Sequence, residues 1–129
     1  MRWLPARVGR SSRAPRDVVE RLTRRGLFRV TRQSTSLDDR ETVQSWLREL
    51  RPDRDQQVFV HRSWGTVAAV ADGRHDVAVL LSHGGKSWFA VPPGGPDKAH
   101  LTPDQIEHIL LDAMTAPKRP QWPDWRHLI

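Results

Sequence analysis

The chain has 129 residues, no cysteine, six histidines and six tryptophans, and its formal net charge is +6. This length is typical of one domain, and the absence of cysteine excludes a disulfide framework, a thiolate zinc site and a cysteine nucleophile. A chain without cysteine is also typical of a reducing compartment. There is no run of about 18 apolar residues and no secretory signal, so the sequence predicts a cytoplasmic protein with no membrane partner.

Positive charge is concentrated in the first 29 residues, which carry nine arginines and two acidic residues, a net charge of +7. From Val30 onward the chain is nearly neutral, at −1. Residues 1–35 contain few large apolar side chains, a composition that favours a mostly disordered basic arm. The exception is a short helix predicted over residues 15–25 and ended by Gly26. Its narrow apolar stripe consists of Val18, Val19 and Leu22.

Two interpretations of the basic segment stay open. One is a nucleic-acid-binding arm with salt-sensitive affinity for phosphates, for which the candidate contacts are Arg13, Arg16, Arg21, Arg24 and Arg25. The other is that the native protein begins at or near Val30, because GTG encodes valine and is also a start codon. Codons for the Arg-Arg-Gly run just upstream can spell a ribosome-binding sequence.

An ordered pattern begins near Leu37 and predicts a single domain over residues 36–129. The first element is a helix over residues 38–50, because Asp38 and Glu41 have the spacing of a capping box. Pro52 ends this helix. Apolar residues follow the cap at helical spacing: Val43, Trp46, Leu47 and Leu50.

Four short strands follow, over residues 57–62, 66–71, 76–82 and 87–91. Each is separated from the next by a short turn signal, namely Ser63-Trp64-Gly65, Asp72-Gly73 and His83-Gly84-Gly85-Lys86. Short turns require antiparallel neighbours, so the strands are predicted to form a meander. The third strand is the most apolar and is expected to be central.

The clearest local signal is a second helix, predicted over residues 102–115. Thr102 and Gln105 form a capping box, and Pro103 occupies the first helical position. The aromatic tail, residues 121–129, is expected to pack back onto the domain or to add a strand at a sheet edge. The predicted fold class is therefore α+β, with a four-stranded antiparallel meander sheet packed with two amphipathic helices, preceded by a disordered basic N-terminal arm.

The reactive residues form no pattern that predicts catalysis. His61, His75 and His83 fall near strand ends, but their spacing matches no metal-ligand motif, so no metal and no other cofactor is expected. Ser82, His83 and Asp76 can be combined into a nucleophilic triad on paper, but no motif fixes their geometry. We therefore expect a protein that is not an enzyme.

The tryptophans divide into two groups. Trp46 and Trp88 lie at positions typical of a core, whereas those in the turn and the tail are rigid aromatic groups of the kind that anchor interfaces. The candidate partner-binding residues are Trp64, His83, Trp122 and Trp125. For the two tail tryptophans, the alternative is that they close the bottom of the core.

From Leu37 the chain has a helix, a small antiparallel sheet with Asp-Gly and Gly-Gly turns, a late capped helix and a Pro-x-Trp ending, over about 90 residues. This order resembles the Imm1-type immunity proteins of bacterial polymorphic toxin systems. The segments that carry the resemblance are Val67 to Gly73, Val77 to Ser82, Lys86 to Val91, Leu101-Thr102-Pro103 and Lys118 to Trp125. The basic N-terminal segment is foreign to this pattern.

The resemblance implies a non-catalytic protein that binds and blocks a cognate protein toxin. Nuclease inhibitors often present an acidic face to a basic active site, but this domain is nearly neutral, which favours a hydrophobic, tryptophan-centred contact. The predicted function is therefore protein binding, most concretely as an immunity-like inhibitor. The alternative is a nucleic-acid-binding accessory protein that uses the arginine-rich arm.

Overall fold

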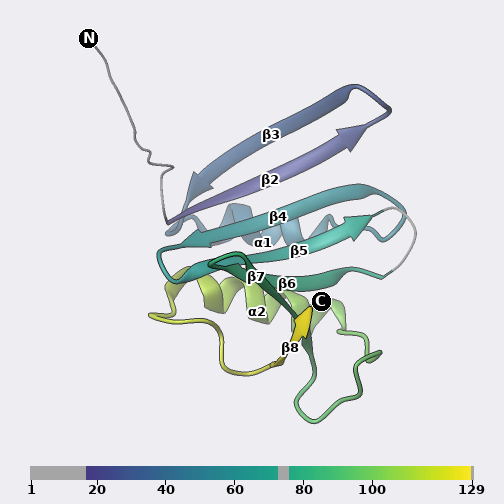
Figure 1. Ribbon diagram of the computed structural model, residues 1–129. Coiled ribbons are helices and arrows are strands. Elements are labelled where there is room, and N and C mark those ends of the chain that lie inside the picture. The colour runs from purple at the N-terminus through teal and green to yellow at the C-terminus, as the bar shows by residue number, and fades with distance from the viewer. Residues whose placement is uncertain (1–16, 73–75, 129) are drawn as a thin grey trace.

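The computed structural model describes residues 17–72 and 76–128 of the chain. In chain order, the elements of these residues are β2 (Val18–Arg25), β3 (Arg29–Ser36), α1 (Arg40–Arg48), β4 (Asp55–Arg62), β5 (Gly65–Asp72), β6 (Ala78–His83), β7 (Lys86–Val91), α2 (Pro103–Thr115) and β8 (Asp124–Leu128). The seven described strands form one antiparallel sheet in the order β3-β2-β4-β5-β6-β7-β8 (Figure 1).

The predicted four-stranded sheet is wrong, because the described part of the chain builds a sheet of seven strands, although the fold is still mixed α and β. The expected meander is present as β4 to β7. The additional strands are β2 and β3, from the segment predicted to be a disordered arm, and β8, from the aromatic tail. The tail therefore adds a strand at a sheet edge, the second of the two arrangements expected for it.

Strand β2 contradicts both the predicted disorder and the predicted helix over the residues that it spans. It lies between β3 and β4, and Val19, which is opposite Val60, is 0% exposed. The guanidinium of Arg21 lies 5.9 Å from the ring centre of Trp46 and 3.0 Å from a carboxylate oxygen of Glu49. An arginine stem covers apolar surface while its charge stays paired or solvated, so this arginine-rich segment can be a strand.

Helix α1 is shorter than the predicted 38–50 and has a different cap. Asp39, not Asp38, is the N-cap, and its Oδ1 accepts a hydrogen bond from the amide of Thr42 at 3.3 Å. The hydroxyl of Thr35 in β3 donates to Oδ2 of Asp39 at 2.5 Å. The hydrogen bonds from Thr35 and Thr42 lower the pKa of Asp39. The end of β3 therefore helps to fix the start of α1.

Helix α2 confirms the predicted capping box. The hydroxyl of Thr102 accepts from the amide of Gln105 at 3.1 Å, and the side-chain oxygen of Gln105 accepts from the amide of Thr102 at 2.9 Å. Pro103 is in the first turn, as expected. These contacts are local in sequence, so the pattern of residues alone was enough to predict them.

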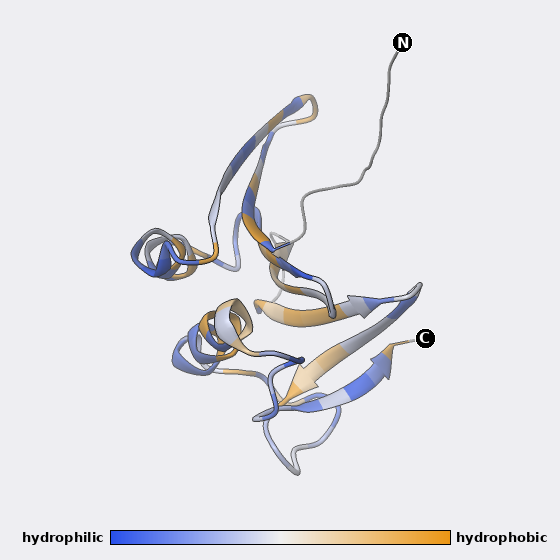
Figure 2. Cartoon of the chain, turned by 90° about the vertical axis from the view of Figure 1, so that its left-hand side faces the viewer, coloured by the Kyte–Doolittle hydropathy of each residue, from blue (hydrophilic) through white to orange (hydrophobic). Residues whose placement is uncertain are grey.

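Both helices lie on the same side of the sheet (Figures 1 and 2), and the core fills the space between the two layers. The helices are joined to each other by Glu107 of α2, which accepts from Arg48 at 2.9 Å and from Gln44 at 3.0 Å. One row of paired residues crosses the helix-facing side of the sheet: Val19, Val60, Val67, Leu81 and Trp88. The apolar side chains of α2 pack against this side: Ile106, Ile109, Leu110, Ala113 and Met114.

Candidate protein-binding site

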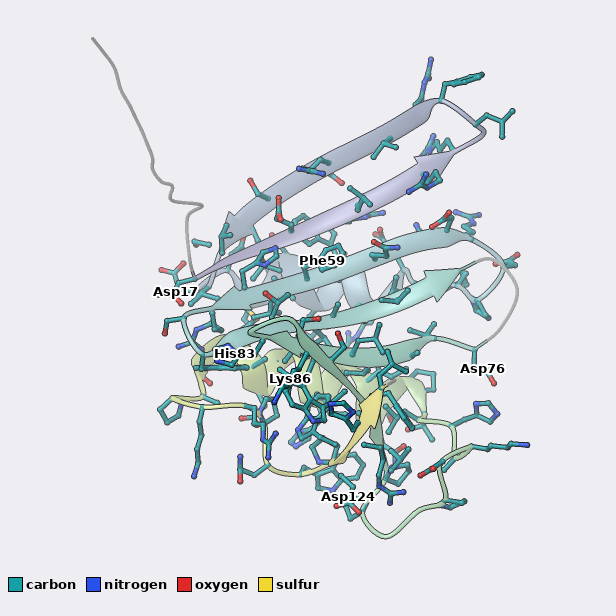
Figure 3. All side chains as sticks on the ribbon, viewed as in Figure 1. Asp17, Phe59, Asp76, His83, Lys86 and Asp124 are labelled. Atoms are coloured by element: carbon teal, nitrogen blue, oxygen red, sulfur yellow. The ribbon has the colours of Figure 1, made fainter. Side chains whose placement is uncertain are left out.

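A hollow of about 390 Å³ lies between the β6–β7 hairpin and the segment that follows α2. We call it the Trp64–Trp88 hollow. Figure 3 labels His83 at the end of β6, close to Lys86 at the start of β7. The residues that line the hollow are Trp64, Leu81, His83, Trp88, Lys118, Arg119 and Gln121. Its walls therefore come from the β4–β5 turn, from β6 and β7, and from the connection between α2 and β8.

Trp64 is held at the rim of this hollow by the C-terminal end of α2. Its indole nitrogen donates a hydrogen bond to the carbonyl of Ala116 at 3.1 Å. The guanidinium of Arg62 lies 5.7 Å from the centre of the Trp64 ring, and it donates to the carbonyls of Ala113 and Ala116 at 2.7 and 3.0 Å. Carbonyls at the end of a helix have no partner within the helix, so these donors stabilise the helix end and fix Trp64 together.

The floor of the hollow is formed by an antiparallel pair. Leu81 in β6 lies opposite Trp88 in β7, and the Trp88 ring packs edge-on against His127 in β8, with ring centres 5.8 Å apart. Close to it, Gly65 follows Trp64 and begins β5. A Cβ at Gly65 would lie 2.9 Å from the carbonyl oxygen of Ser82, and its φ of +146° is one that side chains rarely adopt. The turn that presents Trp64 therefore requires a glycine.

The ionisable side chains that line the hollow are all basic: a histidine, a lysine and an arginine. Lys118 and Arg119 are exposed, His83 is exposed beside them, and no carboxylate is among the lining residues. Two other hollows, of about 390 and 440 Å³, are lined by acidic and basic residues together. The Trp64–Trp88 hollow instead combines aromatic surface with positive charge, which suits a ligand group that is both apolar and anionic.

The four predicted partner-binding residues are only partly brought together. Trp64 and His83 line the same hollow. Trp122 is 36% exposed and packs edge-on against His108 of α2, with ring centres 6.2 Å apart. Trp125 is half-buried against the core, and its indole nitrogen donates to the carbonyl of Pro120 at 2.9 Å. Neither tail tryptophan is among the lining residues of the hollow.

Sequence reasoning missed five lining residues of the hollow: Leu81, Trp88, Lys118, Arg119 and Gln121. Trp88 was predicted to be a core residue, and it does pack against the core, but one side of it lines the hollow. The adjacent cations that follow the predicted helix 102–115 were the one available signal. Their place in the site could be recognised only in the structure, because the connection between α2 and β8 brings them next to the β6–β7 hairpin.

The residues considered for a nucleophilic triad, Ser82, His83 and Asp76, do not come together as one. Asp76 pairs with His100, with 3.0 Å between Oδ2 and Nδ1, and it lies before β6, whereas His83 ends that strand (Figure 3). His61 lies elsewhere, with Nε2 at 2.7 Å from Glu20 and Nδ1 at 3.0 Å from the hydroxyl of Thr66.

Metal-ligating residues form no cluster of three or more within residues 17–72 and 76–128. Of the histidines weighed as ligands, His61 is occupied by two hydrogen-bond partners and His83 faces the Trp64–Trp88 hollow. His75 lies outside the described residues.

Three of the five arginines proposed for nucleic-acid binding lie in β2: Arg21, Arg24 and Arg25. Arg13 and Arg16 lie outside the described residues. Arg21 pairs with Glu49, and Arg24 pairs with Asp55 at 3.3 Å. Arg25 is exposed near the end of the hairpin. Two of the three described candidates therefore already have carboxylate partners.

Comparison of the chain with models of known protein families, with curated proteins and with solved structures found no match. Among the described helices, none has the length and apolar character needed to cross a bilayer.

Proposed function

We propose that this protein is a non-catalytic binding domain, and that it acts as an immunity-like inhibitor that binds and blocks a cognate toxin. The observation that carries the proposal is the Trp64–Trp88 hollow, with its aromatic walls, its exposed cations and no lining carboxylate. Tryptophan supplies much of the binding energy at interfaces, because a rigid ring buries a large area at a small entropic cost.

The charges of the hollow restrict the part of the partner that it fits. An apolar side chain of the partner can contact Trp64 and Trp88, while a neighbouring carboxylate meets Lys118 and Arg119. Complementary charges steer association and select the partner, while the aromatic contact contributes affinity. A partner that presents an apolar residue beside an acidic one is therefore favoured. The resemblance to Imm1-type immunity proteins supports a toxin as that partner.

The test is a growth assay with a candidate toxin taken from the genes that neighbour this one. Co-expression of the full chain is expected to rescue cells from that toxin, and the purified proteins are expected to form a complex. The double charge reversal Lys118→Glu with Arg119→Glu is expected to weaken binding at least tenfold. Lys98→Glu, an exposed substitution outside the hollow, is the matched control and should leave binding unchanged.

Two results would count against the proposal. Failure of the folded wild-type chain to rescue cells, with no complex in solution, would contradict the proposed immunity-like function. Equal binding by the double reversal and by the Lys98 control would keep a binding function but exclude the hollow as its site. Unfolding curves of both variants serve to show that the substitutions leave the domain folded.

Nucleic-acid binding through the arginine-rich segment is the second candidate function. It is favoured by the exposed Arg25 and by the adjacent exposed arginines of β3. Its signature is an affinity for duplex DNA or RNA that falls steeply with salt concentration. Substitution of Arg25 by glutamate should then weaken binding to all sequences alike, whereas Lys118→Glu should not.

A further inference from the structure

The outer strand β3 leaves one backbone edge without a partner strand in the described part of the chain. β3 is at the end of the sheet order and pairs only with β2. The register runs without interruption from Val18 opposite Ser36 to Arg25 opposite Arg29, so no bulge interrupts the strand. β3 also contains no proline. Most natural sheets protect an edge strand by such devices or by covering it.

The turn that joins β2 to β3 exposes large apolar side chains. Leu27 is 88% exposed and Phe28 is 95% exposed, and Val30, at the start of β3, is 49% exposed. Figures 1 and 2 show the β2–β3 hairpin projecting away from the helices and from the rest of the sheet. Among the described residues, the most exposed large apolar side chains therefore lie at the end of a projecting hairpin, next to the outer edge of β3. Exposed apolar groups in this setting mark interaction sites.

The charged side chains of β3 itself are both arginines, Arg29 and Arg32. Residues 21–37 contain five arginines and no acidic residue. Arg29 lies opposite Arg25, and Arg32 lies opposite Leu22. Since successive side chains of a strand alternate between its two faces, Arg29 and Arg32 project from opposite faces of the hairpin. A chain that pairs with β3 would meet positive charge above and below the sheet.

We propose that the outer edge of β3, which pairs with no other described strand, binds an extended, acidic segment of another protein as an additional strand, with Leu27 and Phe28 holding an apolar residue of that segment. Main-chain hydrogen bonds to the edge give affinity in this mode, and side chains give specificity. Acidic residues three positions apart in the partner match the placement of Arg29 and Arg32. This surface is separate from the Trp64–Trp88 hollow, and the inference does not depend on the immunity-like function.

The same observations disfavour other occupants. A second copy of this chain would bring two arginine-rich strands together, and like charges directly opposite each other destabilise a strand pair. Lipid and nucleic acid can use the arginines, but neither supplies the backbone donors and acceptors that an open strand edge can pair with. An acidic polypeptide satisfies the edge, the charge and the exposed apolar turn together.

The test follows backbone amide signals of the full chain by NMR during titration with a capped synthetic peptide. The peptide is built from threonine and valine and carries two glutamates three positions apart; its matched control has lysines in place of the glutamates. The glutamate peptide is expected to shift amides of β3 and of the turn, and to bind at least tenfold more tightly than the lysine peptide. The double variant Arg29→Glu with Arg32→Glu should reverse this preference, and Phe28→Ala should weaken binding severalfold.

Several outcomes would overturn the inference. These are no shift in β3, equal shifts with the two peptides, or shifts confined to the Trp64–Trp88 hollow. Duplex DNA or phosphatidylserine vesicles are titrated in parallel, and shifts of the β3 amides by either of them but not by the glutamate peptide would assign the surface to that ligand. Both substituted arginines are exposed, so an unchanged unfolding midpoint of the double variant verifies that its fold is intact.

Discussion

Replacing Val19 by alanine tests whether β2 belongs to the folded core. Val19 is 0% exposed and lies opposite Val60, so the substitution removes two methyl groups from a packed site. The lost transfer free energy is about 1.6 kcal/mol, at ~0.8 kcal/mol for each group, and the cavity raises the loss to roughly 2–3 kcal/mol. The matched control is Val30→Ala in β3. Because Val30 is 49% exposed, this variant should lose about 0.5 kcal/mol or less.

The assay is urea unfolding followed by tryptophan fluorescence, supported by the thermal midpoint. Val19→Ala should lower that midpoint by roughly 8–12 °C, and Val30→Ala by no more than about 2 °C. Equal midpoints for the two variants would refute the placement of Val19 in the core. Trp46, which contacts Arg21 of β2, is one of the six tryptophans that contribute to this signal.

A chain that begins at Val30 provides the second arm of the same experiment. It lacks β2, whose residues Val18–Thr23 pair with β4. β3 is a poor substitute because it runs parallel to β4 and its helix-facing residues, Thr31, Gln33 and Thr35, are polar. The loss of several kcal/mol is comparable with the whole stability of a small domain, ~5–15 kcal/mol, so cooperative unfolding should disappear. A shortened chain with the midpoint of the full chain would mean that β2 is dispensable for folding.

Three further substitutions test individual contacts. Arg62→Ala should cost about 2 kcal/mol in urea unfolding because it removes the donor to the carbonyl of Ala113 and one of the two donors to the carbonyl of Ala116, and Arg62→Lys should recover only part of this loss. Thr102→Ala should cost about 1 kcal/mol through loss of the cap on the amide of Gln105, whereas Thr102→Ser should be nearly silent. Glu107→Gln tests an ion pair: Arg48 lowers the pKa of Glu107 below its ordinary 4.5, so the ionised carboxylate stabilises the fold. That contribution is complete above the ordinary pKa and is lost as the pH falls through the lowered one, so the unfolding curves of wild type and variant should differ at pH 7 and converge in acid. Curves that stay equally far apart in acid would contradict this role for the Glu107 carboxylate.

The elements that sequence reasoning placed correctly depend on neighbours in the chain. The box formed by Thr102 and Gln105 spans four residues, and the turns of the β4–β7 meander each join adjacent strands. The cap of α1 lies one residue later in the chain than predicted. Both acidic residues accept a hydrogen bond from a hydroxyl at the end of β3, Asp39 from Thr35 and Asp38 from Ser36, so the spacing of the residues does not decide between them as the cap.

From Asp17 onward the basic segment was misjudged, because its composition was weighed without a partner strand. Val18, Val19 and Leu22 fit a helical stripe as well as a strand, and a short apolar set of this kind does not distinguish the two. The choice between helix and strand is made by β4, about 40 residues later in the chain. β2 pairs with the edge of β4, and Val60 lies opposite Val19. The arginines tolerate this arrangement because Arg21 rests on Trp46 and pairs with Glu49.

The sequence by itself determined the late helix with its cap, the central meander, and the choice of Trp64 and His83 as candidates, because each of these follows from residues close together in the chain. Only the tertiary structure decided that Trp64 faces Trp88 across a hollow with Lys118 and Arg119 at its rim. Only the tertiary structure, likewise, turned an arginine-rich segment into an edge strand with an exposed turn. Both arrangements depend on packing between segments that are distant in the chain. Local sequence patterns do not specify which distant segments come together.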